Sequence, residues 1–204
     1  ADRAPRRAFG GESGTLHATA RAPVTPHAGS LPPAREPMTM ASHWQITLLG
    51  ALRAEQGSHT LVNFRRQKTG VLLAYLAYFP QRAHPREALI ELLWPDADLA
   101  SGRLSLSVAL SFLRQNLELP GSPSGSVLAA DRAAVRLHPD AIETDVAAFE
   151  SALREASRAE DAAAREHHLR GAAERYGGEL LPGCYDEWAL RERERLAEAY
   201  LDAL

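Results

Sequence analysis

The sequence predicts a mixed α+β region followed by an all-helical region. Between residues 43 and 138, strand-like segments precede three helical patterns, and two more strand-like segments follow around a tight turn. From residue 139 onward the chain shows helical patterns and is rich in Ala, Glu and Arg. Strands, three helices and a two-stranded ribbon in this order are typical of a winged helix-turn-helix, in which one helix is presented to a DNA groove.

Three regions follow from these changes in pattern. Residues 1–42 contain six prolines and no periodicity, which predicts a disordered N-terminal tail. Residues 43–138 are predicted to form the winged-helix domain, and residues 139–204 to begin a tetratricopeptide-like helical domain. Such repeats need several helix pairs to bury their faces, and about one and a half pairs are present. We therefore expect the helical domain to be truncated at residue 204.

The first strands and the first helix are marked by turn residues and by apolar spacing. Residues 45–49 and 52–55 are expected to form short strands, and Gly57 begins the turn that follows them. Apolar residues then recur at helical spacing from residue 66 to residue 79. Pro80 ends this helix, because proline cannot supply the next backbone hydrogen bond.

Two more helices follow, separated by a short corner. Pro85 opens the first of them, which is expected to run to Trp94. Pro95 cannot continue it, and Asp98 can cap the next helix, which extends to about Asn116. A short corner of this kind is used to place a helix in a DNA groove, although an ordinary helical hairpin in a core is the commoner structure.

The predicted ribbon lies beyond a break at residues 120–125, which are rich in Pro, Gly and Ser. Strands are expected at residues 127–130 and 133–137, joined by a tight turn at Asp131 and Arg132. This ribbon would form the wing of the winged helix.

Three helices are predicted in the acidic region that follows. Thr144 and Asp145 cap the first, a second runs over residues 159–176, and a third runs from Tyr185 to the end. Their lengths are those of paired helices in a tetratricopeptide-like domain.

Composition argues against several classes of protein. The sequence has no run of about 18 apolar residues, so we predict no membrane-spanning helix and no membrane partner. Cys184 is the only cysteine, which rules out an internal disulfide and favours the cytoplasm. His167 and His168 point about 100° apart on a helix and cannot chelate one ion together. Since no catalytic or phosphate-binding motif is visible either, we predict that the protein is not an enzyme and binds neither a cofactor nor a metal.

Charge is unevenly distributed along the chain. Residues 43–138 carry 10 Lys and Arg against 7 Asp and Glu, whereas residues 139–204 carry 8 Arg against 16 Asp and Glu. The net charges of these two regions are therefore +3 and −8. A mildly basic region joined to an acidic one suits a part that faces DNA and a part that faces protein.

Motifs of both regions match those of a known bacterial family. The matching pieces are Leu48-Leu49-Gly50, residues 64–68 leading into 72–76, residues 86–95, residues 110–114, Thr144-Asp145 with Phe149, residues 176–183, and Trp188 with residues 192–196. Together they resemble the bacterial transcriptional activator family of the SARP type, in which a response-regulator-like winged helix precedes a bacterial transcriptional activator domain. The resemblance covers nearly all of residues 43–204.

The resemblance implies a DNA-binding transcriptional regulator, and specifically an activator. Its partner would be double-stranded DNA, bound by inserting the helix at residues 99–116 into the major groove. The helical domain would contact RNA polymerase or mediate self-association.

The third helix of the winged-helix domain carries the surface that would read DNA. One stripe is predicted to face the other two helices, and it consists of Leu106, Ala109, Leu110, Leu113 and Leu117. The opposite face carries Leu104, Ser107, Val108, Ser111, Phe112 and Gln115, with Arg103 and Arg114 on the flank. Ser and Gln can hydrogen-bond base edges, and aliphatic or aromatic groups can touch a thymine methyl.

Phosphate contacts are expected from basic residues at the start of the first helix, before the second helix and on the wing. The full set of candidate DNA-binding residues is Arg65, Arg66, Lys68, Arg86, Arg103, Ser107, Ser111, Arg114, Gln115, Arg132 and Arg136.

A second interpretation is a protein-interaction module whose winged helix no longer binds DNA. Relatives usually carry several arginines on the outward face of the third helix, and this helix has two. The apolar residues Leu104, Val108 and Phe112 could instead be buried against the helical domain. The net charge of −8 in that domain also suits a protein partner.

Overall fold

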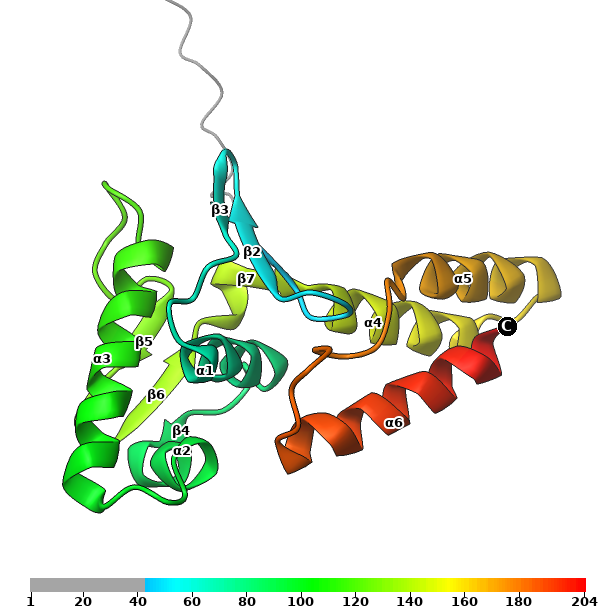
Figure 1. Cartoon of the computed structure of the whole chain (residues 1–204). Coiled ribbons are helices and arrows are strands. Elements are labelled where there is room, and N and C mark those ends of the chain that lie inside the picture. Colours follow the sequence, from blue (N-terminus) through cyan, green and yellow to red (C-terminus); the bar gives the residue numbers. More distant parts are fainter. Residues whose placement is uncertain (1–42) are drawn as a thin grey trace, which may run out of the picture. The chain divides into compact units, whose positions relative to one another are not determined.

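The computed structural model describes residues 43–204, so the predicted disorder of residues 1–42 lies outside the described part of the chain. Figure 1 shows the arrangement of the elements. In chain order they are β1 (Trp44–Thr47), β2 (Arg53–Gln56), β3 (His59–Leu61), α1 (Gln67–Tyr78), β4 (His84–Pro85), α2 (Arg86–Leu93), α3 (Leu99–Leu117), β5 (Leu128–Ala130), β6 (Ala134–Leu137), β7 (Ile142–Thr144), α4 (Asp145–Arg158), α5 (Ala162–Arg175) and α6 (Glu187–Ala203). A single 3-10 turn, Pro139–Ala141, leads into β7.

The strands form two small sheets. In the first, with the order β3-β2-β1-β7, β1 is antiparallel to β2 and parallel to β7. The tight turn between β2 and β3 contains Gly57, whose φ of 58° is a conformation that glycine adopts without strain. In the second sheet, β6 lies between β4 and β5 and is antiparallel to both. The sequence predicted four of these strands, β1, β2, β5 and β6, but not β3, β4 or β7.

Helices α1 to α3 begin and end close to the expected residues. The prediction that Asp98 caps α3 is confirmed, because its carboxylate accepts hydrogen bonds of 3.0 Å from the N–H groups of Ala100 and Ser101. Pro85 immediately precedes α2 and pairs in β4, rather than being the first helical residue. These are small shifts at helix ends, where the backbone is satisfied in several ways.

The hydrophobic core is continuous from the first sheet to the helical region. Leu72, Leu73 and Leu76 on one side of α1 have no exposed surface, and they belong to the same cluster as Trp44 of β1. The indole N–H of Trp44 also donates a 2.9 Å hydrogen bond to the carbonyl of Leu117, which ties β1 to the end of α3. A mixed sheet with three helices and a ribbon, followed by further helices, is consistent with a winged helix followed by a helical region.

Helices α4, α5 and α6 make up the helical region. The predicted cap of α4 is confirmed, because the hydroxyl of Thr144 accepts the N–H of Ala147 at 3.0 Å. Helices α4 and α5 lie side by side, and the chain then returns toward α1, where α6 begins before running back toward α5 (Figure 1). There Trp188 of α6 meets the ring of Tyr75 edge-on at a centroid distance of 5.2 Å. No helix within residues 43–204 is long and apolar enough to cross a membrane.

Polar contacts also fasten the helical region to β1. The carboxylate of Asp145 accepts hydrogen bonds from the backbone N–H groups of Leu48 and Leu49 at 2.8 to 3.1 Å. Burial raises the pKa of this carboxyl group, although these hydrogen bonds act in the opposite direction. The N–H of Leu181 donates to the carbonyl of Leu48 at 2.9 Å. The segment between α5 and α6 therefore continues the hydrogen bonding of the first sheet.

Candidate nucleic-acid interface

Helix α3 faces the core with the stripe of residues that the sequence predicted. Leu106 and Leu113 are fully buried, and Leu110 and Leu117 are 4% and 1% exposed. The stripe packs on α1, α2 and β5. In Figure 1 the other side of α3 faces away from the remaining elements. The side of α3 available to a partner is therefore the one that carries Ser107, Ser111 and Gln115, all of which are exposed.

The expectation that the outward apolar residues of α3 could be buried against the helical region is wrong. Leu104 is 68% exposed and Val108 is 47% exposed. Phe112 is half-buried, and the group above its ring is the guanidinium of Arg65, 5.5 Å from the ring centroid. The outward face of α3 is open to a partner from outside the described chain.

Arg65 is positioned on one flank of this face by its backbone. Its φ of 56° lies in the left-handed region, and its N–H donates a 3.0 Å hydrogen bond to the side chain of Asn63. The cation–π contact with Phe112 then holds the guanidinium beside α3. Arg66 follows directly and is exposed at the start of α1.

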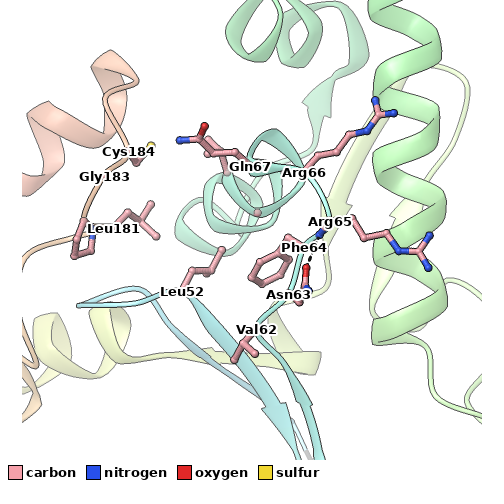
Figure 2. A pocket seen from close by; sticks show the side chains of 13 residues that line it. Leu52, Val62, Asn63, Phe64, Arg65, Arg66, Gln67, Leu181, Gly183 and Cys184 are labelled. Atoms are coloured by element: carbon pink, nitrogen blue, oxygen red, sulfur yellow. Dashed lines mark hydrogen bonds between the residues drawn. The ribbon is translucent and has the colours of Figure 1, made fainter.

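Figure 2 shows this segment where it borders a pocket of about 570 Å³ between the β2–β3 region and the loop at Leu181. The side chains of Arg65 and Arg66 extend away from Leu181 and Cys184 in this view. Their charges are therefore directed to the side of α3 rather than into the pocket.

Arg86 lies on the opposite flank of α3. Its Nη2 is 3.4 Å from the hydroxyl oxygen of Ser107, and its Nη1 donates a 3.1 Å hydrogen bond to the carbonyl of Asp131. Arg86 therefore connects α3 to the turn between β5 and β6. The carboxylate of Asp131 accepts the N–H groups of Ala134 and Ala133, which lowers its pKa and shapes that turn.

The remaining predicted basic residues differ in solvent exposure and in the carboxylates that they face. Arg103 is exposed and 3.4 Å from the carboxylate of Glu87. Arg132 and Arg136 are exposed, in the β5–β6 turn and on β6. Arg114 is half-buried: its Nε has no hydrogen-bond partner and lies 3.9 Å from Glu118.

Lys68 is the predicted site residue that the structure places elsewhere. Its ammonium forms a 2.9 Å ion pair with Asp186, which directly precedes α6. The side chain is half-buried between α1 and the helical region, so its charge is already neutralised within the protein. The sequence grouped Lys68 with Arg65 and Arg66 because the three are neighbours along the chain. Only the fold shows that Lys68 points to another element.

The contacts that join these residues to α3 were not predicted. The sequence placed Phe112 on the outward face and Arg65 at the start of α1, but nothing local indicated that the two side chains would meet. The contacts of Arg86 with Ser107 and with the β5–β6 turn depend in the same way on β4 pairing with β6.

No protein-family model matches the sequence, and no curated protein is significantly similar to it. Among solved structures, the chain is similar to EmbR of Mycobacterium tuberculosis, whose structure is a complex with a low-affinity phosphopeptide. The TM-score is 0.67 at 24% sequence identity, over 79% of this chain and 44% of the EmbR chain. The chain thus corresponds to less than half of that EmbR chain. At this identity the likeness establishes the fold, a mixed sheet with helices followed by a helical region.

Proposed function

We propose that the protein is a DNA-binding transcriptional regulator of the SARP type, acting as an activator in the cytoplasm of a bacterium. In this proposal α3 enters the major groove of double-stranded DNA, and the turn between β5 and β6 lies against the backbone as a wing. The protein has no catalytic role and needs no cofactor. The tetratricopeptide-like helical domain contacts RNA polymerase or a second copy of the protein.

The observation that carries this proposal is the surroundings of the exposed face of α3. The leucine stripe is buried, Ser107, Ser111 and Gln115 are open, and arginines lie on both flanks. A helix in the major groove has phosphates of the two strands on its two sides, so this distribution of charge fits a duplex. The fold similarity to EmbR and the sequence motifs support the same conclusion.

The proposal is tested by replacing Arg65, Arg66 and Arg86 with alanine together. Binding to a fluorescent random-sequence duplex at low salt is expected to weaken by roughly a hundredfold, since three exposed ionic contacts of about 0.9 kcal/mol each are lost. The slope of log K against log salt concentration should fall by roughly three, because about 0.9 counterions are released per phosphate contact. Fluorescence anisotropy over a salt series measures both quantities.

A matched control removes the same charge from another surface. Arg154 of α4 and Arg165 and Arg170 of α5 are exposed in the helical region, and their triple alanine variant also loses three positive charges. This variant should bind DNA as the unaltered protein does. Equal weakening in both variants would mean that binding follows net charge alone, and the proposed placement of α3 would be rejected.

The second candidate function is a protein-interaction module that has lost DNA binding. The observation in its favour is the exposed apolar pair Leu104 and Val108 at the centre of the face that would otherwise read bases. It predicts no binding of any duplex at low salt, which the same anisotropy experiment detects directly.

A further inference from the structure

The centre of the outward face of α3 is apolar. Leu104 and Val108 are four residues apart, so their side chains lie on the same side of the helix, one turn apart. They are 68% and 47% exposed, and both project from a helix whose opposite side is firmly held in the core. A rigid helix therefore presents a pair of aliphatic groups to whatever it meets.

Polar groups on this face have limited capacity to read bases. The hydroxyl of Ser107 donates to the carbonyl of Arg103 within the helix at 2.8 Å, so its proton is already used. The guanidinium of Arg103 faces Glu87, and that of Arg114 is half-buried beside Glu118. Ser111 and Gln115 remain available for base edges. The face thus offers more aliphatic surface than free hydrogen-bonding groups.

The charge around this pair indicates which partner would cover it. Arg65 lies on the flank of α3 that carries Phe112, and Arg86 lies on the flank that carries Ser107. An apolar strip between two positive flanks is complementary to a groove with a phosphate backbone on each side. We therefore take a DNA duplex, rather than an apolar protein surface, as the occupant.

Within the major groove, the apolar group that a side chain can reach is the C5 methyl of thymine. Resting on the function proposed above, we propose that Leu104 and Val108 are specificity-determining residues that pack against thymine methyl groups. Four residues of helix rise about 6 Å, and base pairs are stacked about 3.4 Å apart, so the two methyls should lie within roughly two base-pair steps. The target would then be recognised in part by two closely spaced thymines.

The test first identifies binding sites and then removes single methyl groups. Duplexes bound by the full 204-residue chain are selected from a randomised pool, and the tightest is resynthesised with deoxyuridine at one thymine position at a time. Deoxyuridine lacks the C5 methyl but keeps the base pairing and the O4 acceptor. Dissociation constants are measured for the unaltered protein and for the Leu104→Ala and Val108→Ala variants.

Leu201→Ala is the matched control. Leu201 is also 68% exposed, but it lies on α6, away from the proposed interface. Because Leu104, Val108 and Leu201 are all exposed, none of the three substitutions should disturb folding.

Each critical deoxyuridine is expected to weaken binding of the unaltered protein by about fourfold, the effect of one methyl group returned to water. In Leu104→Ala, deoxyuridine at one of the critical thymines should no longer weaken binding. In Val108→Ala, the same should hold at the other critical thymine, and Leu201→Ala should respond as the unaltered protein does. Binding that is indifferent to deoxyuridine, or equally sensitive in all variants, overturns the methyl assignment and leaves the proposed function standing. Failure to bind any duplex at low salt overturns both.

Discussion

At the scale of single residues, the candidate interface depends on a few side chains whose direction is fixed by their own backbone. Arg65 adopts a φ of 56°, which non-glycine residues rarely do, and Asn63 and Phe112 hold it there. A long side chain held in this way loses less conformational freedom when it meets a phosphate than a free one does. Replacing Arg65 by lysine would keep the charge and lose the planar contact with Phe112.

His84 is a buried titratable residue in β4, within the mixed α/β region. It is 4% exposed, its Nε2 lies 3.0 Å from the carbonyl of Phe79, and its ring packs against Tyr75. Burial lowers its pKa below the ordinary value of 6.5, and the positive charge of Arg82 adds to this effect. The folded protein therefore keeps His84 neutral at a pH where the unfolded chain takes up a proton.

Stability should consequently fall as the pH drops below 6.5, toward the lower pKa of the folded state. The contribution of neutral His84 to the free energy of unfolding is fully present above pH 6.5. Below that pH it falls by at most about 1.4 kcal/mol per pH unit. Urea titrations at about pH 7.5 and about pH 5.5 give the free energy of unfolding at each pH. We expect this free energy to fall less between the two pH values in His84→Gln than in the unaltered protein. The exposed His59, changed to Gln, is the control, and an unchanged pH dependence in His84→Gln would contradict the assignment.

The sequence identified the residue types of the site better than their partners. Ser107, Ser111 and Gln115 were predicted to be exposed from helical periodicity, which is a local property, and they are. The ion pair of Lys68 joins residues 118 positions apart, so no local pattern could have indicated it. The same holds for Arg86, whose contacts require the turn between β5 and β6 to lie beside the start of α2.

At the scale of elements, the corner between α2 and α3 is set by a close contact. Gly102 of α3 is buried, and a Cβ atom at this position would lie 2.4 Å from Cγ2 of Ile90 on α2. The two helices can approach this closely because residue 102 has no side chain. The orientation of α3 relative to α2, and with it the direction of the exposed face of α3, depends on this glycine.

Gly102→Ala is expected to destabilise the protein by about 1–3 kcal/mol, although alanine is the better helix former by about 1 kcal/mol. In an Ile90→Ala background the methyl has space, so the same substitution should cost much less. Gly171→Ala in α5 is the control, since its new Cβ would meet only the terminal Nη1 of the long Arg175 side chain, which can turn away. The urea midpoints of Gly102→Ala, Ile90→Ala, the double variant and Gly171→Ala measure these effects. If Gly102→Ala lowers stability equally with and without Ile90→Ala, the steric explanation is excluded.

Elements were predictable where the chain pairs with its own neighbourhood. The six α-helices of residues 43–204 and the antiparallel pairs β1–β2 and β5–β6 carry their signals in periodicity, caps and turn residues. Strand β7 pairs with β1 across about a hundred residues, and β4 has only two residues, one of them proline. Neither has a local signal, because what makes each a strand is a partner elsewhere in the chain.

At the scale of the whole molecule, the mixed α/β region and the helical region share one core. Trp188 lies among Tyr75, Tyr78 and Phe79 of the α1 end, and Lys68 pairs with Asp186 beside it. The hydroxyl of Tyr78 donates a 2.6 Å hydrogen bond to Glu192. Burial raises the pKa of Tyr78, and the hydrogen bond to Glu192 raises it further. Arg195 joins the same group and also reaches Glu150 of α4.

We therefore expect the two regions to unfold together. The three tryptophans report on different parts: Trp44 on the first sheet, Trp94 on the end of α2, and Trp188 on α6. Single-tryptophan proteins, made by changing the other two to phenylalanine, should give coincident denaturant transitions that also match circular dichroism. A transition at a lower denaturant concentration in the Trp188 protein alone would show that the helical region unfolds independently.

The parallel pairing of β1 with β7 has a practical consequence for anyone who wishes to shorten the protein. A fragment ending at residue 138 would lack β7, and the hydrogen-bonding edge of β1 would be left without its neighbour. It would also lack the carboxylate that receives the N–H groups of Leu48 and Leu49. Such a fragment would tend to self-associate through its open strand, so a shortened version should retain at least the first turns of α4.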